Sequence, residues 1–227
     1  MFFDPIYLVF LAPGMILAIW AQWRIHSAYA EGNQYAPRSG LSGAEAAQAV
    51  LANAGVAGVR IEPVEGVLTD HYVPGEKILR LSPDVYAGRS LAALGVAAHE
   101  AGHAIQDANR YPLLVIRNSM VPLASFGSNA AWIILLIGFF MQLFQLILIG
   151  IAVFSLTVIF QLVNLPVEFD ASRRARLSLV EGGLVTSKED AVVGKVLNAA
   201  AMTYVAATLT SVLTLLYFVF RAGGARD

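Results

Sequence analysis

Residues 118–167 read NSMVPLASFGSNAAWIILLIGFFMQLFQLILIGIAVFSLTVIFQLVNLPV, a run of 50 residues without a single Asp, Glu, Lys or Arg. One helix of that length would extend about 75 Å, whereas a bilayer core is crossed by about 20 residues. We therefore expect two transmembrane helices, at residues 119–141 and 144–165, joined by a tight turn near residues 141–145.

Two further charge-free segments lie outward from this run and predict a first and a fourth transmembrane helix, at residues 5–23 and 197–220. The composition agrees, since 57% of the residues are hydrophobic and only 14% are charged. Soluble domains carry about 25% charged residues. The first segment lacks Lys and Arg before a long apolar core, which favours a retained anchor over a cleaved signal peptide.

The charge balance and the missing cysteines exclude several classes of function. The formal net charge is -1, so the chain lacks the basic surplus with which nucleic-acid binders neutralise phosphates. There are no cysteines, which excludes disulfides, thiol catalysis and cysteine-based zinc ribbons. A metal site in this chain must therefore use His, Asp and Glu.

The polar residues lie between the predicted spans, in residues 25–117 and 166–195. Four spans place both of these segments on one side of the membrane and both termini on the other. Basic residues cluster beside the spans on the polar side, around residues 110–117 and 173–176, whereas Arg221 and Arg226 are the basic residues on the terminal side. The positive-inside rule therefore predicts a cytoplasmic polar part.

Short local signals organise residues 25–117. Ser42 and Glu45 form a capping-box pattern before a helix that ends at Gly55. Three β-like runs follow, at residues 59–61, 67–72 and 78–81, with Pro and Gly between them. A long helix is then expected at residues 90–109. The predicted fold class is a mainly α membrane protein with four transmembrane helices and an α+β part that carries a small β-sheet.

The long helix contains the sequence AAHEAGHAIQ at residues 97–106. His99 and His103 are four residues apart, which places them about 40° apart on one helix face. Two imidazoles in this arrangement can bind one zinc ion, and Glu100 can act on water at that metal. A purely structural histidine pair is the alternative interpretation.

Catalytic zinc usually takes three protein ligands and keeps one position for water. Glu168 is the best candidate for the third ligand, because a helix that starts at Pro166 would carry it inward. The alternative is an acid at the membrane interface that balances neighbouring arginines. Three other residues remain open as ligands: His71, Asp107 and Asp170.

HEAGHAIQ at residues 99–106, followed after the membrane hairpin by EFDASRRA at 168–175, resembles the YugP-like family of neutral zinc metallopeptidases. The stretch LTDHYVPGEKILRLSPDVYAGRSLAALGVAAHEAGHAIQ, residues 68–106, is similar to the central block of that family, and the likeness runs from about residue 5 to 215. A more distant resemblance is to the HtpX and CAAX prenyl protease group. There a Glu-Phe-x-Ala-Asp motif completes the zinc site, but Ser172 stands where that group commonly has Asp.

The resemblance implies a zincin-like (gluzincin) catalytic part at residues 25–117 and a helical part at 166–195 that supplies the third ligand. It assigns zinc to His99, His103 and Glu168, and it assigns the role of general base to Glu100. It also implies a protein or peptide substrate in contact with the bilayer, and a location in a bacterial inner (cell) membrane.

Two features of such a protease stay open in the sequence. The donor to the oxyanion could come from His71, Tyr72, Arg173 or Arg174, and the choice between Ser172 and Asp170 as support for a ligand is unresolved. Residues 77–81 (KILRL) are expected to be an edge strand above the zinc helix that binds substrate backbone by β-addition.

Two other classes of protein are alternatives to this type of metallopeptidase. A non-proteolytic zinc-binding scaffold or subunit derived from a protease would have no need of Glu100. A site-2-type intramembrane protease would place its motif within a span and use Asp-Gly, a dipeptide that this chain lacks. A homo-oligomer or a membrane scaffold partner is compatible with either assignment.

Overall fold

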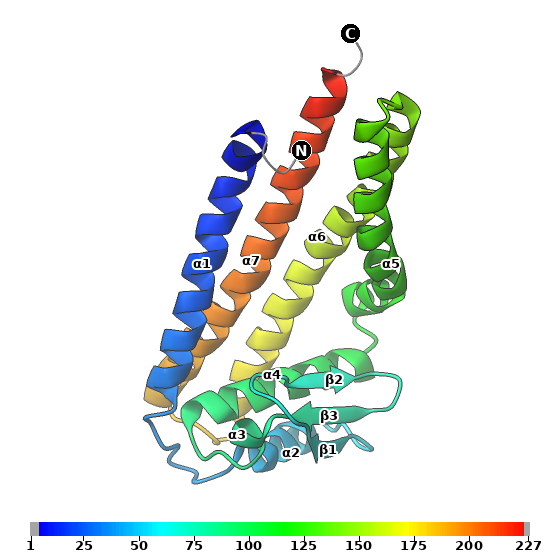
Figure 1. Ribbon diagram of the computed structural model, residues 1–227. Coiled ribbons are helices and arrows are strands. Elements are labelled where there is room, and N and C mark those ends of the chain that lie inside the picture. The colour runs from blue at the N-terminus through cyan, green and yellow to red at the C-terminus, as the bar shows by residue number, and fades with distance from the viewer. Residues whose placement is uncertain (1–4, 225–227) are drawn as a thin grey trace. The chain divides into compact units, whose positions relative to one another are not determined.

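The computed structural model describes residues 5–224, which form seven helices and three strands. Contacts divide the chain into two compact units. The first comprises residues up to 21, 115–166 and those from 203 on; the second comprises residues 22–114 and 167–202. The elements are α1 (Pro5–Gly32), α2 (Gly43–Asn53), β1 (Arg60–Pro63), β2 (His71–Val73), β3 (Ile78–Leu81), α3 (Pro83–Tyr86), α4 (Leu91–Ala108), α5 (Pro112–Phe140), α6 (Phe144–Glu181) and α7 (Ser187–Gly223) (Figure 1).

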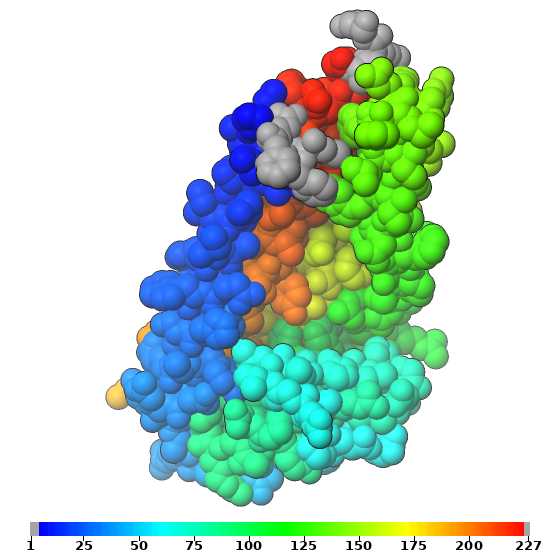
Figure 2. Space-filling model, in the orientation of Figure 1, coloured from blue at the N-terminus to red at the C-terminus, as the bar shows by residue number. Residues whose placement is uncertain are grey.

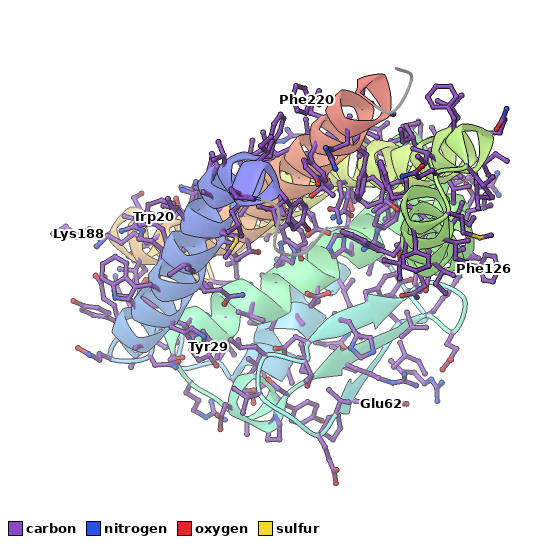
Figure 3. The ribbon with its side chains drawn as sticks, turned by 45° about the horizontal axis from the view of Figure 1, so that its top comes forward. Trp20, Tyr29, Glu62, Phe126, Lys188 and Phe220 are labelled. Atoms are coloured by element: carbon purple, nitrogen blue, oxygen red, sulfur yellow. The ribbon has the colours of Figure 1, made fainter. Side chains whose placement is uncertain are left out.

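Four helices of the described chain, α1, α5, α6 and α7, are long and apolar enough to cross a membrane. Large apolar side chains cover the outer surface of the first unit, for example Phe126 at 79% exposed and Phe140 at 90%. Figure 2 shows the surfaces of α1 (blue) and α5 (green), and Figure 3 shows Phe126 and Phe220 directed outward. The expected mainly α membrane protein is confirmed, because such surfaces suit lipid rather than water.

The core of the first unit is aromatic. The ring of Phe218 meets that of Trp132 edge-on at 5.3 Å between centroids, and Tyr217 lies 4.8 Å from Tyr7. Glycine allows the helix backbones to approach closely, since a Cβ at Gly14 would lie 3.0 Å from the Cα of Thr210. The helices of this unit therefore pack against each other through small residues at their contacts and through closely fitting side chains, as is usual in a bilayer.

The chain reverses between α5 and α6 within three residues, which confirms the tight turn expected near residues 141–145. Gln142 adopts a left-handed backbone conformation in this turn, with φ of 55°. The helix start expected at Pro166 is wrong, since α6 continues through this proline to Glu181. Proline removes one backbone hydrogen bond, but a break here would leave several backbone groups unpaired beside an apolar segment.

The second unit is built around α4. Ser42 and Glu45 form the expected capping box at the start of α2, with both reciprocal hydrogen bonds present. The buried faces of α2 and α4 share one apolar core with β3, α6 and α7, represented by Val50, Leu79 and Leu179. This core holds the helix that carries both histidines.

The three strands form a sheet in the order β1-β3-β2, with β1 parallel and β2 antiparallel to β3. The expectation that residues 77–81 form an edge strand is therefore wrong, because β3 is paired on both sides. Its apolar residues are almost completely buried, as in a central strand, with Leu79 and Leu81 at 0% exposed. The edge strand that contacts α4 is β2 (Figure 1).

Candidate metal centre

Helix α4 places His99 and His103 next to each other on one face. The helix begins after Ser90, whose hydroxyl accepts a hydrogen bond from the backbone N–H of Ala93. The two imidazole rings are 4.8 Å apart between centroids and nearly perpendicular, at 82°. Both side chains are largely buried, with 13% and 10% of their surface exposed.

Helix α6 brings Glu168 to these histidines from 69 residues further along the chain. Its Oε2 lies 3.3 Å from His99 Nε2 and 3.5 Å from His103 Nε2. Ligands at the usual zinc distances of ~2.0–2.1 Å in a tetrahedron are ~3.3 Å apart. The carboxylate and the two imidazoles therefore have the chemistry and the spacing for a zinc ion. Within residues 5–224, this is the one group of three or more such side chains whose ligand atoms converge, all within 4.8 Å.

A glycine allows α4 and α6 to approach this closely. A Cβ on Gly102 would lie 2.6 Å from the backbone oxygen of Ala171. Glycine costs an α-helix about 1 kcal/mol relative to alanine. Gly102 lies between His99 and His103 in the sequence, and its missing Cβ lets the segment of α6 that carries Glu168 approach both rings.

Gln106 is a site residue that the sequence analysis missed. It is completely buried, at 0% exposed, and its Oε1 lies 3.0 Å from His103 Nδ1. Its Nε2 donates at 2.9 Å to the backbone oxygen of Val167 and to Asp170 Oδ2. Its place three positions after His103, on the helix face that also carries His99, was the signal that could have found it.

Ser172 and Asp170 contact different parts of the cluster. The Ser172 hydroxyl lies 3.1 Å from His99 Nδ1. Asp170 reaches His103 only through Gln106, and it also pairs with Arg173 and Arg174. Partners at the outer nitrogen of a histidine fix its tautomer and its orientation towards a metal.

Glu100 follows His99 on α4 and is buried, at 9% exposed. Burial by itself would lower the pKa of His103, but the hydrogen bond to Glu168 and the negative charge of Glu100 raise it above the ordinary imidazole value. The two carboxylates thus favour a positive charge at this point, whether it is a proton or a metal ion.

The remaining predicted residues have other partners. His71 Nδ1 lies 2.7 Å from the backbone oxygen of Thr69. The Tyr72 hydroxyl donates a hydrogen bond to Asp107 at 2.9 Å. Burial is the main cause that raises the pKa of Tyr72 above its usual range, and the bond to Asp107 raises it further. The Arg174 guanidinium, besides its pairing with Asp170, lies 5.7 Å from the Tyr111 ring centroid.

Residues 7–223 match the family model described as "Putative neutral zinc metallopeptidase". The chain is 44% identical over 222 residues to "Putative membrane protease YugP" of Bacillus subtilis (strain 168), and the match covers 98% of each chain. No solved structure matches.

Proposed function

Because the chain belongs to this family of neutral zinc metallopeptidases, we propose that it is a membrane-integrated zinc metalloendopeptidase. Its substrates would be membrane-associated or misfolded proteins, cleaved at peptide bonds. The observation that carries the proposal is the convergence of two imidazoles and one carboxylate, whose ligand atoms lie within 4.8 Å of one another, beside a buried acid on the same helix as the histidines.

His99 and His103 would bind zinc through Nε2, and Glu168 through its carboxylate. When bound, zinc would polarise a scissile carbonyl and acidify a water molecule. The neighbouring residues act on the ligands: the hydroxyl of Ser172 holds the outer nitrogen of His99, and the amide of Gln106 holds that of His103. The Nε2 atoms of the two rings lie 3.3 and 3.5 Å from Glu168 Oε2 and would be the atoms that bind the ion.

Glu100 would take the proton from the attacking water and deliver it to the leaving amine. A carboxylate suits this role when it is buried and close to the reacting atoms. Glu100 is buried, at 9% exposed, and it directly follows His99 on α4.

The substrate would bind at the edge of the sheet. The oxyanion that develops on its scissile carbonyl would be stabilised by a neighbouring hydrogen-bond donor. β2 is an edge strand and can pair with an extended peptide, which gives affinity through the backbone with little side-chain selectivity. Of the four candidate donors, Tyr72, Arg173 and Arg174 are each already bonded to a carboxylate. His71 on β2 binds a backbone oxygen through Nδ1 and, unlike the other three candidates, is not bonded to a carboxylate there. Its Nε2 is therefore the best candidate for the oxyanion donor.

Glu100→Gln tests this mechanism directly, because it keeps the shape of the side chain and removes the proton acceptor. We expect zinc content and folding to be unchanged and cleavage of an unstructured protein to fall by about 10²–10⁴-fold. A parallel His71→Ala variant should keep its zinc and lose kcat if His71 is the oxyanion donor. Equal cleavage by wild type and Glu100→Gln at matched zinc content would rule out the peptidase mechanism and favour the non-proteolytic scaffold.

We also propose that the catalytic part faces the cytoplasm of a bacterial cell, on the basis of the basic residues beside the spans. The chain has no cysteine, so single cysteines can report the topology. Gly75→Cys and Gly224→Cys are suitable, since a Cβ at Gly75 meets nothing within 4 Å and one at Gly224 meets nothing closer than 3.8 Å. In intact cells an impermeant maleimide should label residue 224 and leave residue 75 unlabelled; the reverse pattern would overturn the orientation.

A further inference from the structure

The side chain of Gln106 joins the two helices that carry the candidate metal ligands. It lies on α4, one turn after His103, and its amide nitrogen reaches the backbone oxygen of Val167 and the carboxylate of Asp170 on α6. These two partners stand on either side of Glu168 in the sequence. Gln106 therefore contacts one ligand directly and holds the helical segment that presents another.

The hydrogen bonds leave only one orientation for the Gln106 amide. A backbone oxygen can only accept, and the Asp170 carboxylate, which pairs with Arg173 and Arg174, accepts as well. The NH₂ group must therefore face α6, and the amide oxygen must face His103. Because an amide oxygen can only accept, the neutral His103 ring must carry its proton on Nδ1, which leaves the Nε2 lone pair for a metal.

We propose that Gln106 is a positioning residue of the zinc site: it selects the metal-binding tautomer of His103 and holds the α6 segment around Glu168 in place before the metal arrives. The inference rests on the proposed zinc ligands. It adds that the bonds to Val167 and Asp170 keep the site assembled in the metal-free protein, so that binding does not have to order α6.

The residue is suited to this task because it is a neutral amide. It supplies an acceptor on one side and two donors on the other, which neither a carboxylate nor a hydrocarbon of similar size provides. Glutamate at this position would turn a second carboxylate towards Asp170, and methionine would fill the space without any of the three hydrogen bonds.

Zinc affinity, measured by competition with a chelator on the full-length protein in detergent, tests the proposal. Loss of a group that orients a ligand typically weakens metal binding by about 10–100-fold, and we expect this for Gln106→Met and for Gln106→Glu. Adding Asp170→Asn to Gln106→Glu should restore part of the affinity, because the asparagine amide can donate to the new carboxylate. The cobalt(II) absorption spectrum of Gln106→Met should also differ from that of wild type, which reports an altered ligand geometry.

Ser90→Ala is the matched control. It removes the N-cap of α4 and so lowers the stability of the same helix, while leaving all three hydrogen bonds of Gln106 in place. In the metal-free state both Ser90→Ala and Gln106→Met should melt at lower temperature than wild type, but only Gln106→Met should lose zinc affinity.

The proposal is overturned if Gln106→Met binds zinc within twofold of wild type, or if Ser90→Ala loses as much affinity. It is also overturned if the double variant binds no better than Gln106→Glu alone. None of these measurements depends on peptide hydrolysis, so failure of the protease assignment would leave their outcome unchanged.

Discussion

Asn164 and Glu168 lie one turn apart on α6, both buried, yet they belong to two units that are stabilised differently. Asn164 lies in the apolar unit and accepts a single hydrogen bond, at 3.1 Å, from Arg117. Glu168 lies in the second unit and meets two histidines whose outer nitrogens each have a further partner. The first unit packs mainly through apolar and aromatic side chains, whereas in the second the buried polar groups around Glu168 form a connected set of hydrogen bonds.

The difference indicates where substitutions should matter. Apolar residues on the outside of the first unit face lipid, which is as apolar as they are, so replacing one of them changes little. In the second unit a removed polar group leaves its partner buried and unpaired, which costs more than the hydrogen bond itself contributes.

The largest effect is expected for Glu168→Ala, compared with Asn164→Ala. Loss of Glu168 removes a proposed ligand, so zinc affinity should fall by more than the ~10–100-fold typical of a supporting residue. Asn164→Ala should leave zinc affinity unchanged and cost about 1–3 kcal/mol of stability, because it removes the hydrogen bond that the Arg117 guanidinium donates to Asn164. Chelator competition and thermal unfolding in detergent measure both quantities. Full zinc affinity in Glu168→Ala would remove this residue from the ligand set, and His71 would be tested next.

Leu79→Ala and Phe126→Ala compare the inside of one unit with the outside of the other. Leu79 is completely buried in the core beneath α4, and its truncation should lower the unfolding free energy by about 2–5 kcal/mol. Phe126 is 79% exposed, and its truncation should change stability by less than about 0.5 kcal/mol in detergent. A large loss of stability in Phe126→Ala would mean that its surface is covered by protein, which would support a homo-oligomer.

The smallest effect is expected for two glycines of α4. Gly102→Ala brings a Cβ to 2.6 Å from the backbone oxygen of Ala171, so α4 and α6 must separate and stability should fall by about 1–3 kcal/mol. In Gly95→Ala the nearest atom is a side-chain carbon of Val193 at 3.1 Å, which can move slightly. The gain of about 1 kcal/mol in helix propensity should roughly offset that adjustment. Equal thermal midpoints for the two variants would show that the contact of Gly102 with α6 does not limit the approach of the helices.

The sequence by itself determined the features that depend on local pattern. Long charge-free runs reveal membrane helices because the hydrocarbon core excludes charge over about 20 residues, and the structure has four such helices. The spacing of His99 and His103 places them on one face of any helix, and Ser42 with Glu45 forms a cap wherever a helix starts there. These properties involve residues no more than a few positions apart, so they can be read without knowing the fold.

Only the tertiary structure decided which distant residues meet. β3 was expected at an edge, but its position in the sheet depends on pairing with both β1 and β2, which a local run of apolar residues does not specify. Ser172 contacts His99, and Gln106 reaches Val167 and Asp170, only because α4 and α6 pack together at Gly102, where a glycine lets one backbone approach the other. Such contacts depend on the packing of whole helices, and neither hydropathy nor periodicity along the chain specifies which helix faces which.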